Sequence, residues 1–92
     1  MEYEVLCVEI DSSSDYDDCR CISKIGYKNY AKRKKTPRVV HNKIKNDDKF
    51  YIKEDGDKTY LEAKEREGTK YVRTESNDTK EDNLLKQQTC RW

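Results

Sequence analysis

The sequence predicts an α+β fold: an antiparallel β-meander joined by an N-terminal strand, with one short helix packed on the sheet. Three observations predict it. Residues 50–52, 60–63 and 70–74 alternate apolar and polar side chains, and glycines separate them, which is typical of strands joined by tight turns. Thr36-Pro37 precedes apolar residues spaced four apart, a typical helix start. An apolar run of strand length opens the chain.

The 92 residues make one domain, residues 1–92. A charged fraction of 42% against an apolar fraction of 33% leans toward disorder. However, the net charge is only +1, and the apolar residues come in strand-like clusters. We therefore expect a folded domain with an acidic loop at 11–20, a basic loop at 28–36 and a partly ordered tail at 75–92.

The first strand is expected from Tyr3 to Ile10. Strict alternation would place one set of apolar side chains on one face and a second set on the other. The first set is Leu6, Val8 and Ile10, and the second set is Tyr3, Val5 and Cys7. Residues 21–27 are left open, because the spacing of Ile22 and Ile25 suits a helical turn better than a strand.

The helix is expected near Pro37 to Lys45, with Val40 and Ile44 on one face, and it should end by Asn46. Asp55-Gly56 and Gly68 supply the turns of the meander from Lys49 to Thr74. Leu84-Leu85 should dock the tail on the core.

The four cysteines are Cys7, Cys19, Cys21 and Cys90. The first residues carry no basic leader and no apolar run of signal-peptide length, so a cytoplasmic location is expected, in a cellular or a viral protein. Reduced thiols are expected there, with Cys7 in the core. Disulfide pairing stays open, as does a zinc site built on Cys19-Arg20-Cys21 with Cys7, Cys90 or His41.

The second half of the chain resembles a known family. Its features are Gly68-Thr69-Lys70-Tyr71-Val72-Arg73-Thr74, a polar spacer, Asp82-Asn83-Leu84-Leu85 and a late Cys90. Val5-Leu6-Cys7-Val8, Ile22-Ser23-Lys24-Ile25-Gly26 and a short central helix fit the same pattern. The chain is thereby similar to the domain of unknown function 3892 family, small bacterial and archaeal proteins. Gln87-Gln88-Thr89 and Arg91-Trp92 depart from the family's tail. The resemblance implies a fold and no activity, so function has to be argued from sites.

Charge is segregated along the chain. Residues 9–18 carry five carboxylates and no basic residue, whereas residues 28–45 carry eight basic residues and no carboxylate. A basic surface with aromatic residues suits nucleic acid, because cations displace counterions from phosphates and rings stack on bases. The plainer interpretation is a solvated loop balanced by the acidic segment, which the near-neutral net charge favours.

A row of tyrosines forms a second candidate surface. If Phe50, Ile52, Leu61, Ala63 and Val72 face the core, then Tyr51, Tyr60 and Tyr71 share the opposite face, with Lys53, Lys64 and Arg73. Such a face could take a partner, because tyrosine offers a large contact area at low entropic cost. The alternative is that cross-strand tyrosines only stabilise the sheet.

No enzyme motif stands out, and the chain is expected not to be an enzyme, with no cofactor and no metal. A His41–Cys90 pair has no supporting motif. The leading hypothesis is a non-catalytic module that binds, regulates or inhibits a macromolecular partner, as small charged proteins of mobile elements often do. A protein partner is favoured over nucleic acid bound at Lys28–Lys45, no membrane is expected, and the oligomeric state is open. The predicted binding residues are Tyr27, Lys28, Tyr30, Lys32, Arg33, Lys34, Lys35, Arg38, Lys43, Tyr51, Tyr60, Tyr71 and Arg73.

Overall fold

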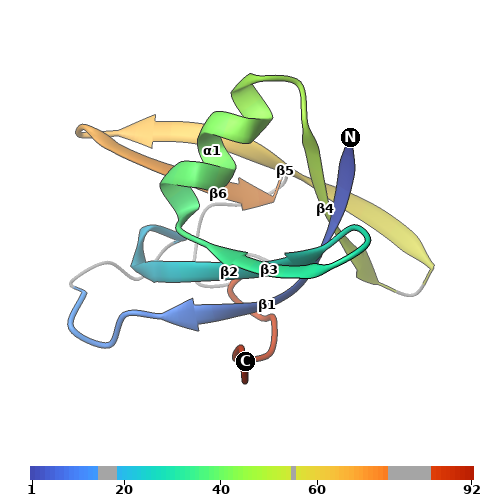
Figure 1. Cartoon of the computed structure of the whole chain (residues 1–92). Helices are drawn as coiled ribbons and strands as arrows, with labels where there is room; N and C mark the ends of the chain where they lie inside the picture. Colours follow the sequence, from blue (N-terminus) through green and yellow to red (C-terminus); the bar gives the residue numbers. More distant parts are fainter. Residues whose placement is uncertain (15–18, 55, 75–83) are drawn as a thin grey trace.

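The structure, a computed structural model, describes residues 1–14, 19–54, 56–74 and 84–92. Within these ranges six strands form one mixed sheet in the order β3-β2-β1-β4-β5-β6, so the α+β class is confirmed (Figure 1). The elements are β1 Glu2–Ile10, the 3-10 turn η1 Cys19–Cys21, β2 Ile22–Lys28, β3 Lys32–Lys35, α1 Pro37–Lys45, β4 Lys49–Glu54, β5 Asp57–Arg66 and β6 Thr69–Thr74. Residues 15–18 of the expected acidic loop and residues 75–83 of the expected tail lie outside the described residues.

The meander β4-β5-β6 forms as predicted. β4 pairs antiparallel with β5, and β5 with β6. Gly56 has a φ of 85°, while Glu67 and Gly68 have φ of 52° and 81°. Positive φ at both central residues of the second turn matches the twist of the two strands it joins. The expected antiparallel sheet is only part of the architecture, since β1 joins the meander in parallel beside β4.

Helix α1 begins and ends where the sequence predicts. The Thr36 side chain accepts a hydrogen bond from the backbone N–H of Val39 at 3.4 Å, and Pro37 occupies the first turn, where no donor is needed. Asn46 follows as the C-terminal cap. Val40 is buried and Ile44 packs against the core cluster, so the apolar stripe faces the sheet.

Residues 21–27, left open from the sequence, are mostly strand β2 rather than the helical turn that their spacing suited. Glu9 pairs with Lys24 and Ile10 pairs with Ile22, so Ser23 is an extra residue, a β-bulge. The bulge places Ile22 and Ile25 three residues apart although both are buried in strand. A spacing that looked helical therefore arises from an irregularity in strand pairing.

A second bulge changes the faces of β1. Val5 pairs with Tyr27 and Cys7 with Gly26, which leaves Leu6 as the extra residue. Val5 and Val8 consequently both enter the core, while Cys7 points to the opposite face. The strict alternation expected for Tyr3 to Ile10 is broken at this point.

The basic loop expected at residues 28–36 is confirmed only around the hairpin tip at 29–31 and at Thr36. Lys32–Lys35 forms β3, which pairs antiparallel with β2 from Ile25 to Lys28. Backbone hydrogen bonds rather than side-chain burial hold this strand, so an apolar pattern could not reveal it. β3 ends the sheet order, and it is the most basic strand of the chain.

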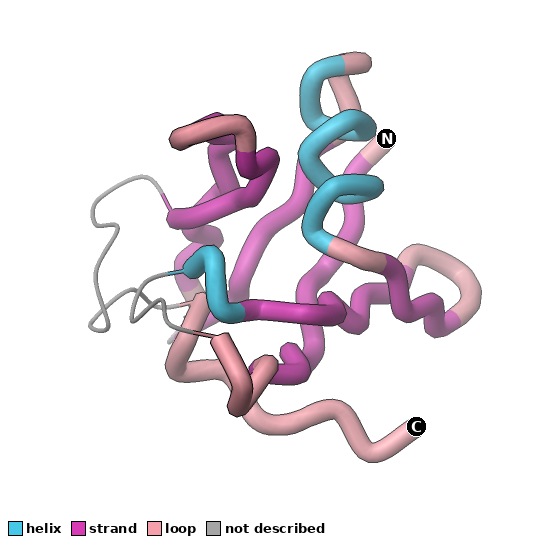
Figure 2. Tube along the Cα trace, turned by 90° about the vertical axis from the view of Figure 1, so that its left-hand side faces the viewer, coloured by secondary structure: helices cyan, strands magenta, loops and turns pink. Residues whose placement is uncertain are grey.

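The C-terminal segment runs beside β1, and its last residues, Cys90 and Trp92, lie over β2 on the face away from α1 (Figure 1 and Figure 2). The backbone N–H of Val8 donates to the Gln88 carbonyl at 2.9 Å, and that of Cys90 donates to the Val8 carbonyl at 3.1 Å. Leu84 is fully buried, which confirms that it docks this segment on the core. The segment thus continues the sheet beside β1, beyond the three residue pairs that join β1 to β4.

Cys7 and Cys90 form a disulfide, so the expectation of four reduced thiols is wrong for this pair. Cys19 and Cys21 are buried and not disulfide-bonded. A Cβ atom at Gly26 would overlap the Cys7 sulfur and lie 3.0 Å from the Cys90 sulfur. Glycine is therefore required at position 26, because β2 passes directly beneath the disulfide.

Three aromatic rings join β1, β2 and β4 in the core. The Phe50 ring stacks on Tyr3 with a centroid distance of 4.8 Å and meets Tyr27 edge-on at 4.9 Å. Tyr3 and Tyr27 also meet edge-on, at 5.2 Å. Such contacts add to the free energy of burying the rings.

Replacing Tyr27 by phenylalanine is expected to raise the free energy of unfolding by about 1 kcal/mol, because the buried Tyr27 hydroxyl has no hydrogen-bond partner among the described residues. Burial raises the pKa of this hydroxyl, and the neighbouring Tyr3 raises it further. Above pH about 10 the unfolded chain loses a proton that the folded chain keeps, so stability falls as the pH rises.

The Tyr27→Phe variant should therefore be more stable at neutral pH and lose less stability in alkali, as measured by urea unfolding across that range. Tyr3→Phe is the matched control for the gain at neutral pH, because the Tyr3 hydroxyl already has a contact with the Met1 sulfur. Equal alkaline losses in Tyr27→Phe and the parent would contradict the argument.

Candidate functional site

The candidate site is the surface around strand β3, here called the basic edge. It consists of the exposed residues Lys28, Tyr30, Lys32, Arg33, Lys35 and Arg38. Strand pairing decides where these side chains point. Arg33 and Lys35 pair with the buried Tyr27 and Ile25, so they lie on the helix side of the sheet. Lys32 pairs with Lys28 and lies on the other side, so the cations surround the edge of the sheet.

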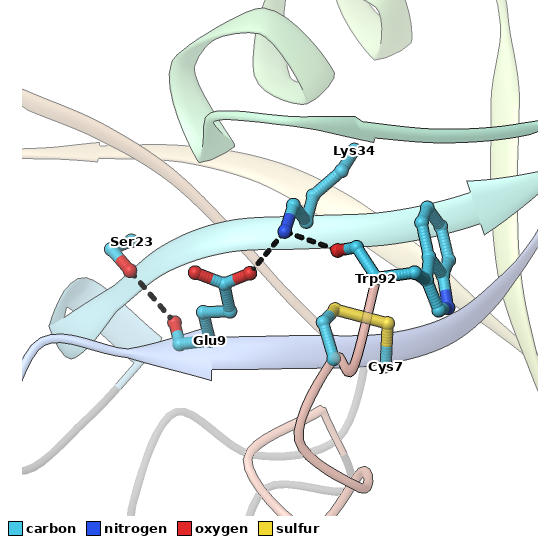
Figure 3. A network of polar contacts seen from close by, with 6 residues as sticks. Cys7, Glu9, Ser23, Lys34 and Trp92 are labelled. Carbon is cyan, nitrogen blue, oxygen red and sulfur yellow. Dashed lines mark hydrogen bonds and ion pairs between the residues drawn. A yellow bond between two sulfur atoms is a disulfide. The ribbon is translucent and has the colours of Figure 1, made fainter.

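Lys34 also lies on β3, but its charge is neutralised by an ion pair. Its ammonium group forms an ion pair with Glu9 at 2.6 Å and donates to the backbone carbonyl of Trp92 (Figure 3). Ser23 donates to the Glu9 carbonyl at 3.1 Å in the same network. These contacts link β1, β2 and β3 to the C-terminal segment and hold β3 in place.

Unlike Lys34, the basic residues of the basic edge have no ion pair within the part of the chain that the structure describes. The Lys32 ammonium lies 5.8 Å from the centre of the Trp92 ring, a cation–π contact that keeps the full charge. A positive surface without paired carboxylates concentrates anions near it.

Tyr30 stands at the tip of the hairpin between β2 and β3. It is 97% exposed, the largest exposure among the large apolar side chains described. A cavity of about 180 Å³ lies beside it, lined by Met1, Tyr3, Asn29, Tyr30, Ala31 and Arg33. Tyr30 and Arg33 thus place an aromatic ring and a guanidinium group at one small hollow.

The tyrosine row is only partly formed. The rings of Tyr51 and Tyr60 lie 6.0 Å apart, and both are half-buried. The prediction that Tyr71 is an exposed binding residue is wrong, because Tyr71 lies in the core cluster and is only 4% exposed. The same prediction for Tyr27 is wrong for the same reason, because Tyr27 is 1% exposed. Both tyrosines lie in strands buried on two sides, where alternation no longer separates exposed from core positions.

Cations already cover the two remaining tyrosines. The Lys58 ammonium lies 4.6 Å from the centre of the Tyr51 ring, and that of Lys49 lies 5.9 Å from the Tyr60 ring. An ion pair with Glu2 raises the pKa of Lys58, so this lysine stays charged. Since β2 and β1 separate β3 from β4, the tyrosines do not belong to the basic edge.

Arg73 and Lys43 also lie outside the basic edge. Arg73 on β6 is half-buried and its Nε lies 3.6 Å from a Glu62 oxygen. Lys43 on α1 is half-buried, and its ammonium group lies 5.8 Å from the centre of the Tyr3 ring. The structure therefore brings together the predicted residues from Lys28 to Arg38 and separates the others from them.

A larger cavity of about 450 Å³ lies between the end of α1 and strands β4 and β5. Its lining residues are Ile44, Asp47, Asp48, Lys49, Tyr60 and Leu61. The N-terminal ammonium lies 3.6 Å from Asp48, and Lys49 contacts the Tyr60 ring. This cavity combines two carboxylates with one lysine, whereas the basic edge gathers several exposed cations without ion pairs among the described residues, so we place the site at the basic edge.

The residues considered for catalysis and zinc binding have other contacts. His41 is buried, and its Nδ1 lies 3.0 Å from the Tyr71 carbonyl, to which it donates. Cys90 is bonded to Cys7, so it forms no pair with His41 and offers no thiolate to a metal. In the described ranges, no three His, Cys, Asp or Glu side chains group as metal ligands.

Two features of the site were missed from the sequence: the strand character of Lys32–Lys35 and the contact of Lys34 with the chain terminus. A run of four basic residues gives no strand signal. The cysteines near both ends of the chain were the available hint that the C-terminal segment returns to β1.

Comparison with protein families finds a match to "Protein of unknown function (DUF3892)" over residues 4–86. The matched range contains all of the basic edge and Cys7, and it ends before Cys90. Neither the curated proteins nor the solved structures give a match. Among the described helices, none has the length and apolar character needed to cross a membrane.

Proposed function

The chain belongs to the DUF3892 family of proteins of unknown function, and we propose that it is a non-catalytic binding module that recognises an acidic protein partner through the basic edge. The observation that carries the proposal is the set of exposed cations around β3 without ion pairs among the described residues. Like charges held together on a folded surface repel one another, and an acidic partner relieves this repulsion.

A protein partner is favoured because the cations accompany an open sheet edge. Strand β3 is the last strand of the sheet order, and edges of this kind pair with other chains. The near-neutral net charge, +1, also differs from the strongly basic balance typical of nucleic-acid-binding domains.

Nucleic acid is the second candidate, and one observation favours it. The exposed ring of Tyr30 lies among the cations and could stack on a base. If nucleic acid is the ligand, Tyr30→Ala should weaken binding of single-stranded DNA or RNA and leave binding of an acidic peptide unchanged.

The proposal predicts that Lys32→Gln, Arg33→Gln and Lys35→Gln together weaken binding of an acidic peptide about tenfold, since each exposed charge contributes up to about 1 kcal/mol. The measurement is fluorescence anisotropy of a labelled polyglutamate peptide, titrated with the protein at low and at physiological salt. Higher salt should weaken binding to the parent protein, because salt screens exposed charges.

The matched control replaces Lys49, Lys53 and Lys70 by glutamine, which gives the same net charge with the basic edge intact. It should bind the peptide as the parent does. Equal weakening in both triple variants, or no binding at low salt, would contradict the proposal. Parallel titrations with single- and double-stranded oligonucleotides decide between the two candidate partners.

A further inference from the structure

The two edges of the sheet differ. At one end of the strand order, α1 and η1 pack against β6, and His41 donates to the Tyr71 carbonyl of that strand. At the other end lies β3. Among the described residues, no backbone group outside the β2–β3 pairing hydrogen-bonds to Lys32–Lys35.

Half of the backbone groups of β3 therefore point away from the protein. In an antiparallel pair, alternate residues direct both N–H and C=O toward the neighbouring strand, and the residues between them direct theirs outward. These outward groups can accept a further strand. The strand is also held in position, because Lys34 is tied to Glu9 and to the Trp92 carbonyl (Figure 3).

Charge selects which strand can pair there. Two copies of Lys-Arg-Lys-Lys placed side by side would put cations opposite cations, which is destabilising, whereas carboxylates opposite them are favourable. Arg33 and Lys35 share the helix side of the sheet, and they are exposed. On the other side, Lys34 is already neutralised by Glu9, and the Lys32 ammonium lies against the Trp92 ring. The arrangement fits a segment with acidic residues at every second position.

We propose that β3 accepts an extended acidic segment of another protein as an added strand, with alternate carboxylates facing Arg33 and Lys35. This inference rests on the proposed function and specifies the form of the partner. Backbone hydrogen bonds along β3 supply pairing, and the two cations select the acidic face.

Two synthetic peptides test the proposal on the full chain. The first alternates glutamate and valine. The second has the same sequence, with N-methyl groups on alternate residues, which keep every charge and remove the backbone donors along one side. Affinity is measured by anisotropy, and hydrogen exchange of the Lys32–Lys35 amides is followed with and without peptide.

The unmodified peptide should bind about tenfold more tightly than its methylated form and slow exchange of β3 amides, because several hydrogen bonds are lost on methylation. Equal affinity of the two peptides would overturn strand addition. If the Lys32→Gln, Arg33→Gln, Lys35→Gln variant then bound neither peptide, the proposed function would still stand. Failure of both peptides and of polyglutamate to bind would overturn both proposals.

Discussion

Reduction of the Cys7–Cys90 disulfide is expected to lower the free energy of unfolding by about 4 kcal/mol. The two cysteines are 83 residues apart, so the bond closes nearly the whole chain into a loop and limits the unfolded ensemble. A domain of this size has a total stability of about 5–14 kcal/mol, so the loss is a large share of it. The reduced protein should remain folded without urea, and its unfolding midpoint should move to a lower urea concentration.

Urea unfolding followed by circular dichroism, with and without a thiol reductant, measures the effect. Cys90→Ser is the matched variant: it should behave like the reduced protein, and reductant should not change it further. Alkylation of the unfolded, unreduced chain should modify two of the four cysteines, Cys19 and Cys21. Modification of all four, or identical urea midpoints with and without reductant, would contradict the disulfide.

Phe50→Ala is expected to cost about 3–5 kcal/mol of unfolding free energy, the usual loss for a buried aromatic ring. Phe50 is 0% exposed and contacts both Tyr3 and Tyr27, so the change removes the centre of the aromatic group that joins three strands. β1 and β4 share only three residue pairs, one of which is Tyr3 with Phe50, so their junction depends strongly on this packing.

Phe50→Leu and Tyr51→Ala are the controls for this prediction. Leucine keeps most of the buried volume, so its cost should stay below that of alanine. Tyr51 is the next residue on β4, half-buried on the opposite face, and its replacement should cost less than the loss of Phe50. Comparable losses for Phe50→Ala and Tyr51→Ala in urea unfolding would show that the aromatic group does not organise the core.

Local signals in the sequence predicted about half of the fold. Thr36-Pro37 marked the helix, because capping and the fixed φ of proline act within one turn. Gly56 and Gly68 marked the turns of the meander, because their positive φ is a local requirement. The α+β class followed from these elements.

The remaining elements depend on contacts between distant residues. The bulge at Ser23 exists only in the pairing of β2 with β1, and it hid a strand behind helical spacing. β3 is held by its backbone, so its four basic side chains gave no sign of it. The Cys7–Cys90 disulfide joins opposite ends of the chain, and no local pattern indicates which cysteines meet.

The candidate site was predicted in part for similar reasons. Exposure of the basic residues from Lys28 to Arg38 and of Tyr30 follows from composition, because unpaired charges stay in water. Burial of Tyr27 and Tyr71 did not follow, since tyrosine is common both in cores and at surfaces. Their placement was decided by elements packed on both faces of their strands.

The most direct test of the account is a map of where an acidic peptide contacts the isotope-labelled protein, read from the shifts of its backbone amide signals. If the basic edge recognises an acidic partner, the largest shifts should fall on residues 28–38, with little change at the cavity beside Asp47. Saturation of the shifts should require more peptide as salt is raised. Shifts centred on Asp47–Lys49, or no shifts at low salt, would contradict the account.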